Sequence, residues 1–457
     1  MNHDSELAGE QIELQDRPIR SGDPPQALPP ADRGKDAYMV LAGCFLAEVF
    51  TWCSFTVWQL PQAALTHRIT ALPYSYGVFT AYYSRTGAFT TETGSVAAIG
   101  TTLVGLMMFL SPLPAWVAQM WPQFRRRSMA MGLLLAVASL VGASFCDDAD
   151  ALLATQGVLY AIGGVFAYFP CFSFLDEWFV HRKGLAYGAA WAGTGLGGSV
   201  APFVINWLLD AYGHRTALRV WAVIELIGVG TAILLVKNRL PSRGGGRPAF
   251  RLTDLSFLKY APFWIFQAAN IIQALGSYLP MLYIPSFAAD IGLPSYSGSI
   301  ALALYSISTC CGCLLLGNLV DRFHVSTVIL LATLAQLVAI FVFWGLTNGQ
   351  AMLYLFAIIY GVFGGATFVT WPGCAWAIRN AIPSCHVDMA FVLSLLTAGK
   401  GLGSVIGGPI GIALMNAGWQ GEGGSAYNSD FAAVIVFTGV SSLLGGLAWV
   451  GRVFRIV

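Results

Sequence analysis

The sequence predicts an all-α integral membrane protein with twelve transmembrane helices arranged as two six-helix pseudo-repeats. The first observation is composition: 56% of the 457 residues are hydrophobic and only 10% are charged, whereas a soluble domain has about 25% charged residues. The second is a series of apolar runs that each approach the roughly 20 residues a bilayer requires. The third is an internal repeat of a glycine-rich sequence motif. The net charge of +1 gives no indication of a nucleic-acid partner.

The repeat joins two segments that lie less than half the chain apart. Ala192 to Gly197 reads AGTGLG, and Ala398 to Gly403 reads AGKGLG. Small residues at four-residue spacing let membrane helices approach closely, because lipid offers no hydrophobic drive for their association. Each copy therefore predicts a tightly packed helix, and the ordered recurrence indicates a duplicated membrane unit.

Taken in order, the chain divides into four segments. Residues 1–35 are polar and lack apolar periodicity, so we expect a disordered cytosolic tail and no cleavable signal peptide. Residues 36–236 form a six-helix bundle, 237–259 a cytosolic connector, and 260–457 a second six-helix bundle. The twelve spans are expected near 37–60, 94–118, 128–146, 152–176, 184–209, 216–236, 261–284, 297–320, 326–346, 351–378, 388–415 and 430–452.

Basic residues give the orientation. Arg125 to Arg127 follow the second span, and Arg182 and Lys183 follow the fourth. Short cytosolic loops are enriched in Lys and Arg, so these loops and both termini are expected in the cytosol. We expect a monomer in the lipid bilayer of the plasma membrane, with a vacuolar or other internal membrane as the alternative.

The segment from Trp178 to Gly193 carries the most specific motif. It contains an aromatic pair, a basic cluster and spaced small residues: Trp178, Phe179, His181, Arg182, Lys183, Ala186, Gly188, Ala190 and Gly193. This pattern resembles the signature of the monocarboxylate-porter branch of the major facilitator superfamily, in its fungal form. Gly317, Asp321 and Arg322 are similar to a loop motif of that superfamily. The resemblance covers roughly residues 36–455 and implies the major facilitator fold.

Two departures from that branch concern the binding site and the first span. Cys313 and Thr309 stand where relatives carry an arginine and an aspartate, so the usual partner for an anionic solute is missing. Residues 53–71 interrupt the first span with a proline and two basic residues. We interpret them as a retained intron, and the alternative is a genuine extracellular loop.

Lys400 is the residue we predict to pair with the solute's charge. It lies near the middle of the span at 388–415, where a lysine costs about 3 kcal/mol, and it is the one cation deep in the second half. A structural pair with Glu48 or Asp388 is the alternative. Tyr305, Trp371 and Trp191 are expected to line the same cavity.

Glu48, inside the first span, is predicted to carry a coupling proton, because burial favours the neutral form of a carboxyl group. A structural hydrogen bond to a neighbouring helix is the alternative. A gating latch is expected where Asp176 and Glu177 pair with Arg182, Lys183 or Arg127. The other gating and signature residues are Gly188, Gly193, Gly197, Gly317, Asp321 and Arg322.

These features predict a secondary active, alternating-access transporter of a small organic solute, with a monocarboxylate or other organic acid and proton symport as the first interpretation. The alternatives are an efflux carrier for a secondary metabolite and a non-transporting receptor on the same scaffold. An enzyme is not expected, because the six histidines are scattered over both sides. Cys310 and Cys313 lie in an apolar run as small buried residues, so neither a cofactor nor a metal is predicted.

Overall fold

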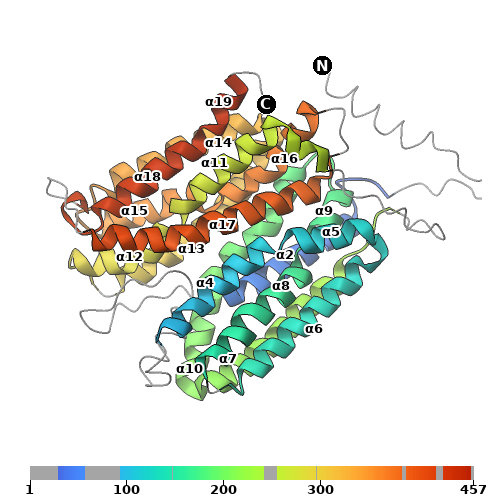
Figure 1. The fold of residues 1–457 in the computed structure, drawn as a ribbon, viewed down its shortest axis with the longest axis horizontal. Helices are drawn as coiled ribbons and strands as arrows, with labels where there is room; N and C mark the ends of the chain where they lie inside the picture. The colour runs from blue at the N-terminus through green and yellow to red at the C-terminus, as the bar shows by residue number, and fades with distance from the viewer. Residues whose placement is uncertain are drawn as a thin grey trace, which may run out of the picture. The chain divides into compact units, whose positions relative to one another are not determined.

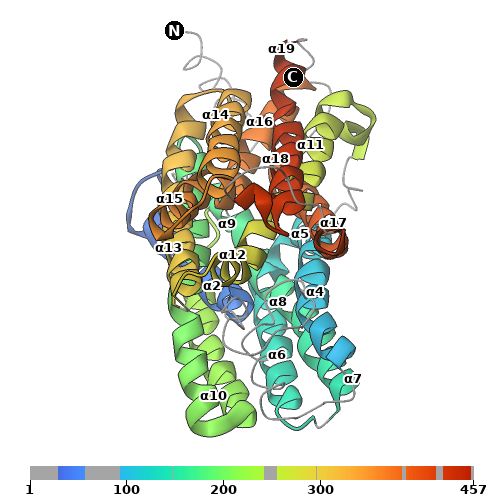
Figure 2. The same cartoon turned by 90° about the vertical axis from the view of Figure 1, so that its left-hand side faces the viewer.

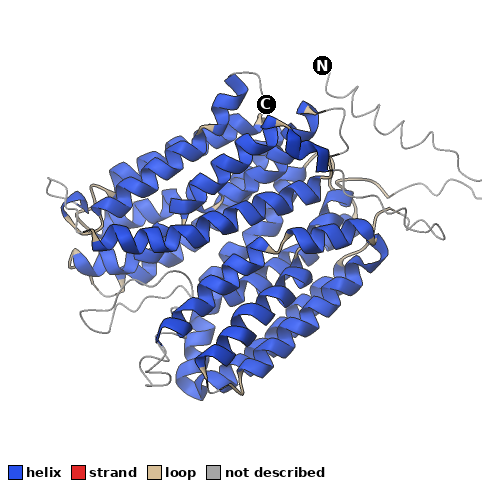
Figure 3. Cartoon of the chain, in the orientation of Figure 1, coloured by secondary structure: helices blue, strands red, loops and turns tan. Residues whose placement is uncertain are grey.

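A computed structural model of the chain describes residues 29–56, 93–146, 148–240, 255–294, 296–382, 387–417 and 426–453. Within these ranges every regular element is a helix and no strand occurs (Figure 3). The residues from Ala31 onward form one compact unit. The all-α fold expected from the composition is confirmed.

Helices of the first half break at proline and glycine. Pro112 begins a new helix after Ser111, and Pro170 separates two others, because proline lacks an N–H group and clashes with the preceding turn. Gly213, with a φ of 76°, divides the longest element into two helical segments. The elements are α2 (Lys35–Thr56), α4 (Thr93–Phe109), α5 (Pro112–Met120), η2 (Pro122–Phe124), α6 (Arg125–Ala143), α7 (Ala149–Leu152), η3 (Leu153–Leu159), α8 (Tyr160–Tyr168), α9 (Cys171–Trp178) and α10 (Lys183–Leu235).

The second half contains one strongly irregular helix, which runs from Gln350 to Ala381. A π-helical turn and a 3₁₀ turn interrupt it near Gly364, Gly365 and Pro372, and such interruptions often mark functional sites. The elements are η4 (Leu255–Lys259), α11 (Ala261–Ser277), α12 (Leu279–Asp290), α13 (Ser297–Arg322), α14 (Val325–Val338), η5 (Ala339–Trp344), α15 (Gln350–Tyr360), η6 (Gly361–Gly365), η7 (Thr367–Thr370), α16 (Trp371–Ala381), α17 (Met389–Asn416), η8 (Ala426–Asn428), α18 (Ala432–Gly446) and α19 (Ala448–Val453).

Nine helical stretches within the described ranges are long and apolar enough to cross a membrane. They coincide with nine of the twelve predicted spans. The other three predictions, 37–60, 184–209 and 430–452, correspond to α2, to the first part of α10, and to α18 with α19. The full count of twelve crossings stays a prediction. The nine stretches are 102–120, 122–143, 150–178, 207–235, 261–290, 297–322, 325–344, 350–381 and 389–416.

The helices lie in two groups, and both views show the same grouping. Figures 1 and 2 show α2 and α4–α10 together, with α11–α19 beside them. The groups meet where α10 packs against α13 and where α4 packs against α17. The predicted segment boundaries at 35/36, 236/237 and 259/260 stay predictions. Residues 57–71, which include most of the predicted insertion, lie outside the described residues.

Glycines bring α10 and α13 together at the level of their backbones. A Cβ atom at Gly184 would lie 2.5 Å from the carbonyl oxygen of Gly317, and one at Gly195 would lie 2.6 Å from that of Ser306. Gly188 faces the same helix between them. Because real Cβ atoms do not approach so closely, side chains at these positions would separate the two groups of helices.

The repeated glycines pack each copy against the first helix of its own half. A Cβ atom at Gly193 would lie 2.8 Å from the carbonyl oxygen of Phe45 in α2. Gly399, its repeat partner, packs against the side chain of Gln267 in α11, and a Cβ atom at Gly403 would lie 2.5 Å from the carbonyl oxygen of Ile271 in the same helix. Gly197 is also buried. The recurring motif therefore has the same packing role in both halves.

Candidate functional site

A cavity of about 90 Å³ lies between the two groups of helices, which is room for several water molecules. Its wall comes from α2, α4, α8 and α10 of the first half, from α12, α13, η6, η7, α16 and α17 of the second, and from Tyr278 between α11 and α12. Most of the lining side chains are aromatic or aliphatic. All five residues predicted to contact solute or proton border it: Lys400, Tyr305, Trp371, Trp191 and Glu48.

Lys400 is held by aromatic ring faces. Its side chain is 5% exposed, and its Nζ lies 5.2 Å from the ring centroids of both Tyr278 and Phe368 and 5.8 Å from that of Trp371. Ring faces attract a cation, by about 2 kcal/mol when the pair is desolvated. They do not neutralise its charge, so the ammonium group can still bind an anion.

Neither of the alternative ion pairs of Lys400 is present. Asp388 lies at the N-cap of α17, where its Oδ1 accepts a hydrogen bond from the Phe391 N–H at 2.9 Å. Glu48 accepts from Thr194 instead. Within the described part of the chain, no carboxylate forms an ion pair with Lys400.

Glu48 lies in the same cavity and is 3% exposed. The Thr194 hydroxyl donates to its Oε1 at 2.6 Å, while Oε2 has no hydrogen-bond partner among the described residues. Thr194 is the repeat counterpart of Lys400, and both residues line the cavity. One brings a hydroxyl to the carboxyl group, and the other brings a charge.

The predicted aromatic residues lie in two ring clusters that both border the cavity. Trp191 of α10 meets Phe368 at a centroid distance of 5.3 Å and Trp371 at 6.0 Å, both edge to face. Tyr305 stacks on Tyr360 at 6.2 Å. Edge-to-face and stacked contacts fix ring orientations, so the cavity wall is an ordered aromatic surface.

Our choice of site residues from the sequence missed several groups. Phe368 and Tyr278 surround Lys400, and Trp52 and Tyr168 lie near Glu48. Aromatic residues are frequent in this chain, and nothing in its pattern separates these four from packing residues. Thr194 could have been found, because it occupies the repeat position of Lys400.

A carboxylate from the second half binds the start of α10. Asp321 Oδ1 accepts from the Gly184 N–H at 2.6 Å, and its Oδ2 accepts from the Leu185 N–H at 2.8 Å. N–H groups in the first turn of a helix lack partners in the helix itself and attract negative charge. Because Asp321 lies at the end of α13, it joins the two groups of helices at this end.

The loop before α10 is held by a second carboxylate. Asp32, which precedes α2 and has a φ of 58°, accepts from the N–H groups of Val180, His181 and Arg182, each at 3.1 Å. These amides precede the pair bound by Asp321, and only Lys183 separates the two sets. The backbone around the basic cluster is therefore fixed by two carboxylates from distant parts of the chain.

The predicted gating charges pair within the first half. Glu177 pairs with Arg125, and Asp176 pairs with Lys183 at 2.7 Å. Both bridges link α9 to its neighbours α6 and α10. The side chains of Arg182 and Arg322 are exposed, and neither makes a hydrogen bond with the described residues. Among the predicted gating residues, Asp321 is the one whose side chain makes hydrogen bonds between the described parts of the two halves.

Neutralising the basic cluster is expected to have a modest effect. Exposed or half-exposed ion pairs contribute about 1 kcal/mol or less, so Arg182→Gln with Lys183→Gln should lower maximal turnover by less than about fivefold. Turnover and solute affinity in reconstituted vesicles measure this. A loss of binding as large as the loss of turnover, with normal folding, would contradict a gating role.

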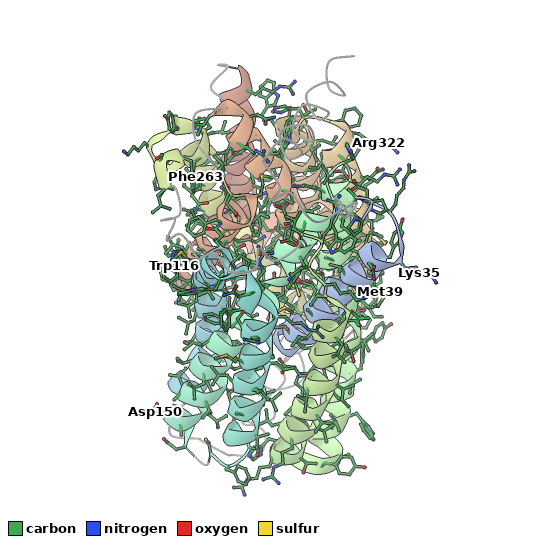
Figure 4. All side chains as sticks on the ribbon, turned by 90° about the vertical axis from the view of Figure 1, so that its right-hand side faces the viewer. Lys35, Met39, Trp116, Asp150, Phe263 and Arg322 are labelled. Atoms are coloured by element: carbon green, nitrogen blue, oxygen red, sulfur yellow. The ribbon has the colours of Figure 1, made fainter. Side chains whose placement is uncertain are left out.

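Two charged residues mark the two ends of the helices. Figure 4 shows Arg322 and Asp150 at opposite ends of the helices. Arg322 closes α13, and Asp150 lies at the start of α7. Which of these ends faces the cytosol stays a prediction from the loops.

Comparisons with known proteins give the family. The profile of the Major Facilitator Superfamily matches residues 51–378. The MFS-type transporter pynF of Aspergillus niger is 23% identical over 76% of this chain and 78% of its own length. The MFS-type transporter dbaD of Emericella nidulans is 25% identical over 81% and 80%. The agnestins efflux protein AgnL12 of Paecilomyces divaricatus is 24% identical over 82% and 81%.

Solved structures show the same fold. The human organic anion transporter MFSD10 superposes with a TM-score of 0.62 at 14% identity, covering 91% of this chain and 100% of its own. The nucleoside transporter NupG gives a TM-score of 0.57 at 13% identity, covering 92% and 99%. With the profile matching more than half of the sequence and nine apolar helices of membrane-spanning length, the chain belongs to the Major Facilitator Superfamily and is a multi-pass membrane transporter of a small molecule, not an enzyme.

Proposed function

We propose that this protein exports an organic anion with an aromatic body and that proton movement drives the export. The observation that carries the proposal is the Lys400 ammonium, which is buried at the cavity wall, surrounded by rings, and not paired with a carboxylate of the described chain. An anionic group on the solute would supply the missing charge, and the aromatic wall would contact its apolar body.

The direction follows from the relatives. One of them is named an efflux protein, and the efflux of a secondary metabolite is therefore the function that we favour. An inward proton gradient drives export only if proton and anion move in opposite directions. Antiport thus replaces the symport that the sequence suggested.

Three further assignments belong to the same proposal. The signature from Trp178 to Gly193 supports the monocarboxylate-porter branch. In this assignment Lys400 replaces the arginine that relatives carry at the position of Cys313. The basic residues of the loops at 125–127 and 182–183 support a cytosolic location of both termini. We assign the protein to the plasma membrane as a monomer.

A transport assay with defined probes tests the function. The probe is naphthalene-2-sulfonate, a fluorescent aromatic anion that does not cross lipid unaided, and the matched control is the 2-naphthyltrimethylammonium cation. In proteoliposomes carrying a pH gradient, we expect saturable movement of the anion and none of the cation. Equal transport of both probes would refute the proposal. So would a failure to transport the anionic probe and every member of a panel of aromatic carboxylates.

Glu48→Gln is expected to uncouple transport from the proton gradient. Glutamine keeps the hydrogen bond with Thr194 but cannot carry a proton, so solute exchange should continue while accumulation against a gradient falls about tenfold or more. Counterflow and gradient-driven uptake measure the two processes.

Glu225→Gln is the matched control for this variant. Glu225 is also fully buried and accepts a hydrogen bond from Tyr160 at 2.9 Å, but it does not line the cavity. It should retain gradient-driven transport. A Glu48→Gln protein that still concentrates the probe along an imposed gradient would remove Glu48 from the coupling mechanism.

A further inference from the structure

We infer that Asn270 is a positioning residue of the cavity, which holds the Trp371 ring beside Lys400. This inference rests on the proposed function. Asn270 lies in α11 and does not line the cavity. It acts through Trp371, which does.

The hydrogen bonds of Asn270 determine the direction of its amide group. Its Oδ1 accepts from Trp371 Nε1 at 3.2 Å, and its Nδ2 donates to the carbonyl oxygen of Leu396 at 2.7 Å. An indole N–H can only donate, and a backbone carbonyl can only accept. One orientation of the asparagine amide therefore satisfies both groups, and an apolar or acidic side chain of the same size cannot.

The hydrogen bond adds a restraint that the ring contacts of Trp371 with Trp191 and Phe368 do not supply, because open space remains beside the residue. The ring borders the solute cavity of about 90 Å³ and also a second cavity of about 30 Å³. Asn270 and Leu396 line the second cavity with it. A side chain with unfilled space on two sides has room to change its orientation, and the hydrogen bond is the directional restraint.

The backbone around Trp371 is also irregular. Trp371 begins α16 directly after the 3₁₀ turn η7, and Pro372 follows it. Proline contributes no N–H group to the first turn. The position of the indole therefore depends on its side-chain contacts as well as on the helix.

The same asparagine also reaches the turn that carries Lys400. Leu396 lies one helical turn before Lys400 in α17. Asn270 thus links α11 to the Trp371 indole and to the turn of α17 that precedes Lys400. These bonds restrain the position of the indole relative to the Lys400 ammonium group. A solute anion that contacts Lys400 and the ring together depends on this relative position.

Gln267 provides a matched control. It lies one turn before Asn270 in α11 and donates from Nε2 to the Leu395 carbonyl oxygen at 3.0 Å. It therefore makes the same kind of bond to α17, but it lines neither of the two cavities and makes no hydrogen bond to Trp371. A general loosening of the contact between α11 and α17 would appear in both variants, whereas loss of ring positioning would appear only at Asn270.

The test is a double-mutant cycle on probe transport with Asn270→Leu and Trp371→Phe. Asn270→Leu removes the bonds to both Trp371 and Leu396, and Gln267→Leu measures the effect of losing a comparable bond to α17 alone. Loss of the bond to the indole corresponds to about fivefold in an equilibrium constant, so Asn270→Leu should raise the apparent KM about fivefold relative to Gln267→Leu and leave the maximal rate within twofold. If Asn270 acts through the indole, the double variant should match Trp371→Phe alone. Gln267→Leu should keep the wild-type KM.

Three results would overturn the inference: KM effects that multiply in the double variant, an equal KM increase in Gln267→Leu, or a change in maximal rate alone. If Asn270→Leu does not reach the membrane, Asn270→Ser enters the cycle in its place. The outcome is separable from that of the proposed function. A wild-type KM in Lys400→Ala would end the anion proposal, while the cycle would still report whether Asn270 acts through Trp371.

Discussion

Lys400→Ala is expected to raise the apparent KM for an aromatic anion by about 10- to 100-fold. The range corresponds to the loss of a hydrogen bond to a charged group, about 1.5–3 kcal/mol. The effect should be large because the ammonium is 5% exposed and no other described cation lines the cavity. Initial rates of naphthalene-2-sulfonate transport over a concentration series give the KM.

Lys400→Arg is the charge-preserving comparison. It should retain part of the transport, because the positive charge stays while the larger guanidinium shifts against Tyr278, Phe368 and Trp371. Surface expression and thermal stability control for folding. A Lys400→Ala protein that reaches the membrane and transports the anion with the wild-type KM would show that the charge-partner idea is wrong and would favour a neutral solute.

Asp321→Ala is expected to lower maximal turnover about tenfold and to change KM little. The variant loses two hydrogen bonds to the first turn of α10 together with a favourable interaction with its dipole, about 1–2 kcal/mol for a partly exposed carboxylate. The population of the state in which Asp321 holds α13 against the start of α10 should therefore fall roughly tenfold relative to the open state. Turnover falls because alternating access requires both end states to be populated.

Cys313 reports the closed state directly. It is fully buried where Gly188 meets α13, so its alkylation requires the halves to separate. Site-resolved mass spectrometry after treatment with a small maleimide should show about tenfold faster modification in Asp321→Ala. Asp321→Asn, which keeps one acceptor oxygen, should be intermediate, and Arg322→Gln should resemble the wild type. Unchanged protection of Cys313 in Asp321→Ala would show that Asp321 does not hold the two halves together.

The sequence alone was sufficient for the fold class and for the residues that break its periodicity. Membrane-spanning helices can be recognised from apolar runs of bilayer length without tertiary information. In lipid the polar groups of a spanning segment's backbone must be hydrogen-bonded within the protein, which an α-helix achieves by itself. An ionisable residue within such a run stands out for the same reason. Lys400 and Glu48 were therefore identifiable from their positions, and the structure brings both to one cavity.

The partners of these residues could not be predicted from the sequence. Glu177 pairs with Arg125, and Lys400 faces rings and not a carboxylate. Many charge pairings and many aromatic neighbours are compatible with the same helical pattern, and only the packing of the two halves selects among them.

The internal repeat and the apolar runs of the sequence thus predicted a duplicated membrane unit and made Glu48 and Lys400 recognisable within it. Tertiary structure decided which side chains meet. Asn270 shows the difference most clearly, since its amide bonds Trp371 and Leu396, each about one hundred residues or more further along the chain. Helical periodicity places a residue on one face of its own helix, but the neighbour on that face is chosen by how separate helices cross and pack.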